Sequence, residues 1–159
     1  GKLLGKEDKA KEQIKEIEDI MAKDGKEVKD KIGKDSTVSI MEVGPKELTL
    51  IGKNFGRGSE VIYQGFGFKH PEAAQKDIPK VGWLSTSFEN FNKYTGDYLL
   101  IPTENGKAPN SSLTKGSIWK NTPAVKDDHV YYYPRNEFMY SDPISVEKQS
   151  KYFKDMLTK

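Results

Sequence analysis

Positions 51–61 read IGKNFGRGSEV, in which an apolar run ends, a glycine-flanked turn follows and a helical pattern begins. Glycine allows backbone angles that other residues rarely adopt, and it removes side-chain bulk from the turn. Phe55 and Arg57 alternate here, so an extended turn would project both to one side and set a flat ring beside a guanidinium rich in donors. The alternative is that Phe55 packs in the core and Arg57 is a surface charge beside the helix.

On either side of this turn, short apolar runs alternate with helical patterns. Strands are predicted at 38–43, 48–51, 83–86, 97–101 and 130–133. Helices are predicted at 58–66, after Ser87, near 119–125, and from Pro143 to Leu157, while the Pro-, Asn- and Ser-rich stretch 102–116 is expected to be a loop. This alternation indicates an α/β sandwich with a mainly parallel sheet.

Residues 7–32 carry one long helical pattern. Its apolar residues recur at spacings of three, four or seven and form a single stripe, made of Ile14, Ile17, Met21, Val28 and Ile32. At 1.5 Å per residue this helix would be roughly 39 Å long. Such a helix is either a solvated surface helix or a strut between two lobes.

Composition excludes several classes of function. The chain has no cysteine, so Cys-ligated zinc, iron–sulfur clusters and thiol nucleophiles are excluded. Basic and acidic residues nearly balance at +2, which gives no strong field for nucleic acid. The two histidines, His70 and His129, are expected to be surface or cap residues, and no nucleotide-binding, metalloprotease or nucleophile-elbow motif is present. A small α/β enzyme stays open, because catalytic groups can converge from distant positions.

A second group of aromatic residues lies near the C-terminus. Alternation along the strand sends Tyr131 and Tyr133 to one face and Tyr132 to the other. Phe138 and Tyr140 fall in the loop before the last helix, where aromatic side chains often line a cleft. Core packing is an equally good interpretation of each residue alone.

Taken in order, several segments resemble the ferric-hydroxamate-binding lipoproteins of Gram-positive bacteria. These segments are LLGKEDKAKE, GKNFGRGSEVIYQ, GDYLLI, SIWKNTPAVKDDHVYYY and EFMYSDPIS. The resemblance covers nearly the whole chain and implies a type III substrate-binding protein, in which one long helix joins two three-layer lobes. Residues 1–33 would then be the connecting helix and 34–159 the C-terminal lobe. Proteins of this kind are close to twice as long, so the N-terminal lobe is expected to lie outside this sequence.

The resemblance also implies roles for particular residues. Phe55 and Arg57 would contact the ligand, although related proteins carry Trp at the first position. Tyr131, Phe138 and Tyr140 would line the cleft. Glu89 would dock onto the permease of an ABC importer, or it is simply a favourable charge in the first turn of a helix.

The ligand implied is an iron(III)-hydroxamate siderophore, bound outside the cytoplasm by a lipid-anchored protein without catalytic activity. Hydroxamate oxygens supply the whole coordination shell of iron(III), so neither a metal site nor a cofactor is expected in the protein. One conspicuous arginine favours a complex of low charge over a tri-anionic catecholate. A catecholate siderophore, haem or cobalamin as cargo, and a purely structural interaction domain, are the remaining alternatives.

Overall fold

Residues 2–159, which the computed structural model describes with side chains from Gly5 onward, contain a five-stranded sheet in the order β3-β2-β1-β4-β5. The strands are β1 (Val38–Val43), β2 (Glu47–Ile51), β3 (Trp83–Ser87), β4 (Tyr98–Thr103) and β5 (Val130–Pro134). β1, β4 and β5 run parallel to one another, whereas β2 is antiparallel to both β1 and β3. The sheet is therefore mixed but mainly parallel, as the alternation of strands and helices predicted.

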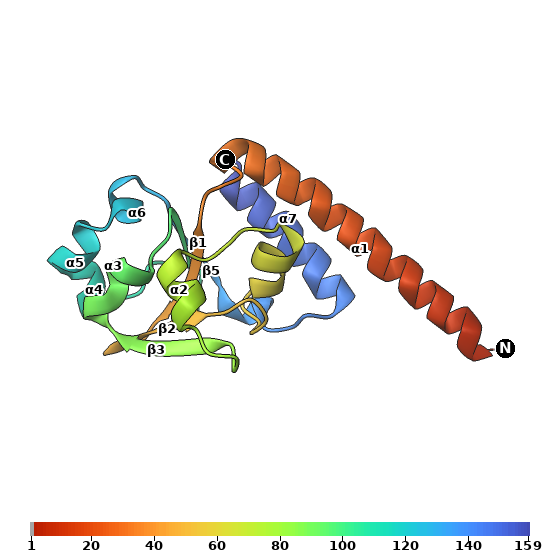
Figure 1. Ribbon diagram of the computed structural model, residues 1–159, viewed down its shortest axis with the longest axis horizontal. Helices are drawn as coiled ribbons and strands as arrows, with labels where there is room; N and C mark the ends of the chain where they lie inside the picture. The colour runs from red at the N-terminus through yellow and green to blue at the C-terminus, as the bar shows by residue number, and fades with distance from the viewer. Residues whose placement is uncertain (1) are drawn as a thin grey trace.

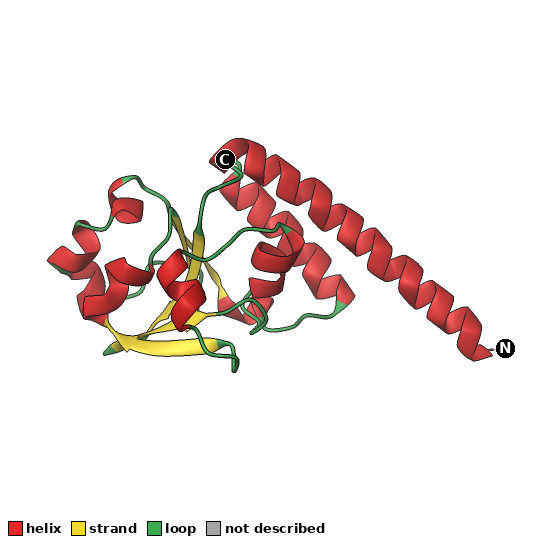
Figure 2. Ribbon diagram, viewed as in Figure 1, coloured by secondary structure: helices red, strands yellow, loops and turns green. Residues whose placement is uncertain are grey.

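Helices cover both faces of this sheet (Figures 1 and 2), which confirms the three-layer arrangement. One face is covered by α1 (Lys2–Ile32), a short π-helix η1 (Glu60–Gly65) and α7 (Pro143–Leu157). The other face is covered by short helices, namely α2 (Glu72–Asp77), α3 (Phe91–Tyr94), α4 (Ser112–Lys115), α5 (Ser117–Lys120) and α6 (Pro123–Lys126). Side-chain alternation along each strand separates the two cores, so that Ile40 packs under α1 and α7 while Met41 packs under the short helices.

Several local predictions need correction. The segment predicted as an ordinary helix at 58–66 is a π-helix, in which Phe66 N donates to the carbonyl of Val61. The predicted loop 102–116 contains the end of β4 and helix α4, and α2 was not predicted. Ser87 precedes a 3₁₀ turn, η2 (Phe88–Asn90), but its side chain makes no capping hydrogen bond. Asp142 caps α7 by accepting from Ser145 N at 3.0 Å, and Pro143 occupies the first turn as predicted.

Helix α1 packs on the lobe only through its second half. Ile17 and Val28 are buried, and the backbone of Gly25 passes so close to Phe66 that a Cβ at this position would lie 2.9 Å from the Cα of Phe66. Residues 5–16 are exposed, and α1 extends well beyond the rest of the molecule (Figure 1). This shape fits a strut, although the division of the chain at residue 33 stays a prediction.

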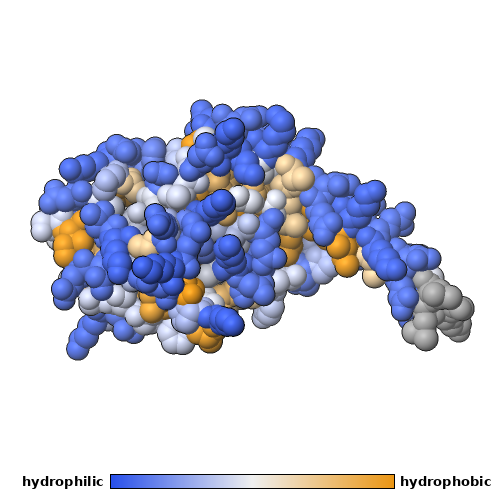
Figure 3. All heavy atoms as spheres, viewed as in Figure 1, coloured by the Kyte–Doolittle hydropathy of each residue, from blue (hydrophilic) through white to orange (hydrophobic). Residues whose placement is uncertain are grey.

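The visible surface is predominantly hydrophilic (Figure 3), including the projecting part of α1, which carries one hydrophobic patch partway along. Ile14, a member of the predicted apolar stripe, is exposed in this part of the helix. No helix within residues 2–159 is apolar over enough of its length to cross a bilayer.

Candidate functional site

The turn after β2 is built from consecutive residues with left-handed backbone angles. Gly56, Arg57 and Gly58 have φ values of 71°, 57° and 82°. Arg57 therefore adopts a conformation that costs a non-glycine residue about 1 kcal/mol or more. The expectation of an extended turn is wrong, since these angles curl the chain back on itself.

Hydrogen bonds from the following residues hold the turn in this shape. The backbone N–H of Phe55 donates to Ser59 Oγ at 3.0 Å, and that of Gly56 donates to Glu60 Oε1 at 3.1 Å. Gly58 lies against the ring of Phe153, so closely that no Cβ fits between them. The glycines of the motif thus serve a left-handed turn and close packing on α7.

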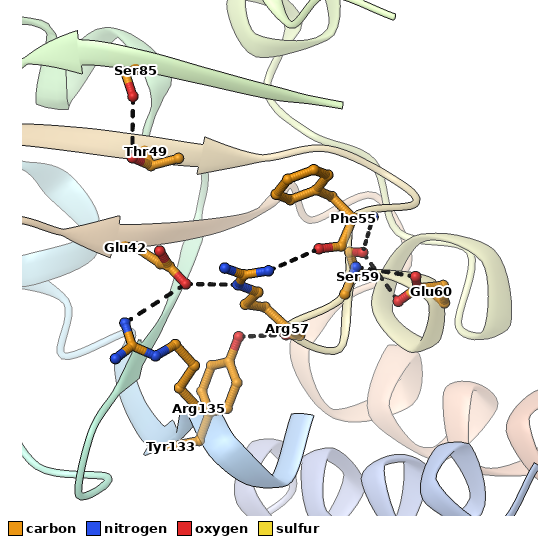
Figure 4. Close-up of polar contacts among 10 residues, drawn as sticks. Glu42, Thr49, Phe55, Arg57, Ser59, Glu60, Ser85, Tyr133 and Arg135 are labelled. Carbon is orange, nitrogen blue, oxygen red and sulfur yellow. Dashed lines mark hydrogen bonds and ion pairs between the residues drawn. The ribbon is translucent and has the colours of Figure 1, made fainter. Parts of the chain in front are cut away.

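The turn places the guanidinium of Arg57 beside the ring of Phe55 (Figure 4), with Cζ 5.4 Å from the ring centre. Arg57 Nε donates to Glu42 Oε1 at 2.7 Å, and Nη1 donates to the carbonyl of Phe55 at 3.4 Å. The ring of Trp83 lies 6.4 Å from that of Phe55 and is 38 % exposed. Phe55, Arg57 and Trp83 together are called the aromatic wall below.

Tyr133 fixes the backbone of the strained residue. Its hydroxyl donates to the carbonyl of Arg57 at 2.7 Å. Burial raises the pKa of the Tyr133 hydroxyl well above its ordinary value, so this group stays a neutral donor. A residue of β5 therefore holds the turn that follows β2, a link that is not visible in the sequence.

Arg57 of the aromatic wall reaches Glu42 at the carboxyl ends of the parallel strands, where open α/β sheets commonly bind ligands, whereas Trp83 is the first residue of β3. Glu42 is near the end of β1, and Arg135 directly follows β5. Arg135 Nη1 lies 4.0 Å from Glu42 Oε1, so both arginines of the chain meet the same carboxylate. Sequence reasoning gave Glu42 no role. The signal available was a charged residue on the same face of the strand as Val38 and Ile40, which lie on the α1 side of the sheet.

The remaining predicted aromatic residues divide into core and surface. Phe138 is 1 % exposed and packs against Tyr133 and Phe153, so its burial contradicts the expected ligand-lining role of its ring. Tyr140 is 70 % exposed and borders a cavity of about 300 Å³. Its neighbour Met139 approaches the turn, because a Cβ on Gly56 would lie 3.6 Å from the Met139 carbonyl oxygen. The backbone of Met139 therefore approaches the turn, whereas the Tyr140 side chain lies among residues 136–138 and α7. Phe138 packs against Gly58 of the turn.

Tyr131 and Glu89 lie away from the aromatic wall. Tyr131 faces the same side of the sheet as Tyr133 but stacks on Tyr98, with ring centres 6.5 Å apart, nearer the amino end of β5. Glu89 is exposed in η2, beyond the end of β3 opposite to Trp83. Of the predicted site residues, the wall thus contains Phe55 and Arg57, whereas Tyr131, Tyr140 and Glu89 lie outside it.

The histidines do not converge on a reactive site. His70 is buried rather than at the surface. Its ring stacks 3.7 Å from that of Tyr63, and its Nε2 lies 2.8 Å from the carbonyl oxygen of Ile51. His129 is half-buried and stacks on Tyr98. Among residues 2–159, no group of three or more His, Asp or Glu side chains is arranged to hold a metal ion.

Comparison with known proteins places this arrangement in a family. The family described as "Periplasmic binding protein" matches residues 1–137. The chain belongs to the periplasmic binding protein family. Two relatives in this family from Bacillus subtilis are the iron(3+)-hydroxamate-binding proteins FhuD, 34 % identical over 160 residues, and YxeB, 35 % identical over 164 residues. The matches cover 99 % and 100 % of this chain but 50 % and 51 % of the relatives. The chain therefore spans about half the length of these periplasmic binding proteins.

Solved structures of such binding proteins share the fold. FhuD2 from Staphylococcus aureus with bound ferrioxamine B superposes with a TM-score of 0.87 at 39 % identity, covering 99 % of this chain and 61 % of that one. The FhuD protein from S. pseudintermedius gives a TM-score of 0.89 at 32 % identity, covering 97 % of this chain and 55 % of that one.

Proposed function

We propose that this chain is the C-terminal lobe and connecting helix of a substrate-binding protein that delivers iron(III)-hydroxamate siderophores to an ABC importer. Three facts support the proposal. The chain belongs to the periplasmic binding protein family, two of its relatives are iron(3+)-hydroxamate-binding proteins, and the FhuD2 structure contains ferrioxamine B.

The observation that carries the proposal is the aromatic wall. The guanidinium of Arg57 lies beside the ring of Phe55 and pairs with Glu42 near the carboxyl end of β1. Within residues 2–159, Nη2 of Arg57 makes no hydrogen bond to a protein acceptor, so it can donate to a ligand.

The chemistry of this wall suits a ferric hydroxamate. Iron(III) is wrapped by ligand oxygens, so the protein needs to recognise only the outside of the complex. A guanidinium donates charge-assisted hydrogen bonds to exposed hydroxamate oxygens, and aromatic rings cover the apolar arms of the siderophore. Phe55 and Arg57 are the proposed ligand contacts, with Tyr140 at the edge. No catalytic step is part of the proposal.

Delivery requires partners outside this chain. The proposed cleft lies between this lobe and an N-terminal lobe joined through α1, and closure of the two lobes would signal loading by a hinge motion. Glu89, exposed on η2, is the proposed contact to the permease. The full-length protein would act outside the cytoplasm, held at the outer face of the cell membrane by a lipid anchor.

Fluorescence titration with ferrioxamine B tests this function. Trp83 is exposed beside Phe55, while Trp119 is buried on the other face of the sheet, so Trp83 is the reporter within this lobe. Full-length protein is expected to bind the complex with quenching that decreases in Trp83→Phe, and residues 1–159 alone are expected to bind weakly or not at all. Submicromolar binding by residues 1–159 alone contradicts the half-site arrangement.

The nearest alternative keeps the fold and changes the cargo to a catecholate siderophore, haem or cobalamin. Parallel titrations of the full-length protein with these ligands separate the alternatives. Preference for any of them over ferrioxamine B would replace the hydroxamate assignment.

A further inference from the structure

Both arginines of this chain share one carboxylate at the aromatic wall. Arg57 Nε donates to Glu42 Oε1 at 2.7 Å, and Arg135 Nη1 lies 4.0 Å from the same oxygen. The side chains of Arg57 and Glu42 are only 23 % and 20 % exposed, so this pair is screened by solvent less than a surface ion pair. Glu42, Arg57 and Arg135 are called the charge cluster below, and their formal net charge is +1.

The other carboxylate near the turn does not belong to this cluster. Glu60 Oε1 accepts from the backbone N–H of Gly56, and Oε2 accepts from the hydroxyl of Ser59. Figure 4 shows Glu60 on the opposite side of the turn from the Arg57 guanidinium. Glu42 is therefore the residue that both orients the guanidinium beside Phe55 and offsets half of the positive charge.

We propose that Glu42 is a positioning and specificity-determining residue that limits the net charge of the charge cluster to +1 and so selects iron(III) complexes of low charge over tri-anionic ones. This inference rests on the proposed function and extends it to the chemical class of ligand. With the carboxylate in place, a neutral or singly charged trihydroxamate meets little net field. Without it, two guanidiniums would face the ligand and would attract a tri-anionic tris-catecholate complex.

The replacement Glu42→Gln removes the charge while retaining a side-chain oxygen that can accept from Arg57 Nε. Three probes separate charge from shape: ferrioxamine B, whose free ammonium gives the complex a positive charge, its neutral N-acetyl derivative, and an iron(III) tris-catecholate of charge −3. At an effective dielectric constant between those of protein and water, one charge at the distance of a bound ligand changes affinity about fivefold per unit of ligand charge.

Dissociation constants of the full-length protein for these three probes test the inference. In Glu42→Gln, affinity for ferrioxamine B should fall about fivefold relative to the N-acetyl derivative, and affinity for the tris-catecholate should rise by more than that factor. Glu42→Asp should bind the three probes in the same order of affinity as the original protein. High salt should reduce the difference in affinity between the original protein and Glu42→Gln. Glu72→Gln makes the same charge change on α2, on the other face of the sheet, and should leave the ratios of the three affinities unchanged.

Two results would overturn the inference. If Glu42→Gln changes all three affinities by one factor, Glu42 only shapes the turn, and the proposed function survives. If the original protein binds none of the three complexes, the proposed function fails and this inference fails with it.

Discussion

The hydroxyl of Ser150 donates a 2.7 Å hydrogen bond to the carboxylate of Asp24, a residue 126 positions earlier in the chain. Both residues are buried between α1 and α7, and Lys154 Nζ approaches the same carboxylate at 3.3 Å. This contact fastens the second half of α1 to the lobe. The interpretation of residues 7–32 as a strut between two lobes stays a prediction, because this contact lies within a single lobe.

Removing the Asp24 carboxylate should destabilise the protein. Asp24→Ala leaves the buried hydroxyl of Ser150 without its acceptor, and the expected loss is about 1–3 kcal/mol of unfolding free energy. Urea unfolding followed by circular dichroism measures this loss. Asp30→Ala is the matched control, because Asp30 pairs with Lys26 in full solvent and should change stability by at most about 0.5 kcal/mol. Equal effects of the two variants would contradict the role given to Asp24.

Arg57→Lys should weaken ferrioxamine B binding about tenfold or more in the full-length protein. Lysine keeps the charge but loses the planar fork that reaches Glu42 and the ligand together. Phe55→Ala should also weaken binding, because one face of the proposed groove is lost. Isothermal titration calorimetry measures both effects. Lys53→Gln removes a charge from the same loop, where Lys53 is exposed, and should bind normally; a comparable loss there would indicate a general charge effect instead.

Gly58→Ala should reduce stability by about 2–4 kcal/mol. Gly58 has a φ of 82°, and an added Cβ would overlap the ring of Phe153, so strain and overpacking act together. Gly116→Ala should stay within about 0.5 kcal/mol of the original protein, since φ is −93° and the nearest atoms lie 3.6 Å from the added Cβ. Thermal unfolding distinguishes these two outcomes.

Substitutions at Phe138 and Tyr140 should affect different properties, namely stability at Phe138 and ligand binding at Tyr140. Phe138→Ala removes a buried ring and should cost about 3–5 kcal/mol of stability. Tyr140→Ala should leave the unfolding midpoint nearly unchanged and weaken ferrioxamine B binding, because the Tyr140 ring is exposed and the preceding residue, Met139, approaches the turn. A stable Phe138→Ala protein would contradict the placement of this ring in the core.

His70 should make stability depend on pH. Burial lowers the pKa of His70 below its usual value, with a further lowering from Lys53 and an opposing effect from the hydrogen bond to Ile51. The unfolded chain then binds more protons than the folded protein as pH falls below about 6.5, so stability should decrease from pH 7 toward pH 5. Unfolding midpoints of the original protein and His70→Gln at pH 8 and pH 5 should show a smaller decrease in the variant. Identical decreases would exclude His70 as the source.

Local sequence patterns were sufficient to predict most of the fold but not the whole candidate site. Pro143 after Asp142 marked the start of α7, and the apolar run at 97–101 marked β4, because caps and buried strands have strong sequence signals. Phe138 was predicted to line the cleft but lies in the core, because the sequence pattern of an aromatic loop residue is the same in both cases. The glycines around Arg57 indicated unusual backbone angles, but they did not indicate that the turn is left-handed.

Periodicity and turn chemistry are local properties, and they were enough to predict an α/β lobe with a long helix and a turn that carries a ring and an arginine. Folding brought Glu42, Arg135 and Tyr133 to Arg57, since Glu42 comes from β1 and the other two from β5 and the residue after it, and these strand ends meet Arg57 only after the sheet has formed. The charge that faces a ligand is a sum over residues distant in sequence. The sequence alone therefore pointed to Arg57 and gave Arg135 no ligand role, whereas in the folded protein the two arginines share a carboxylate.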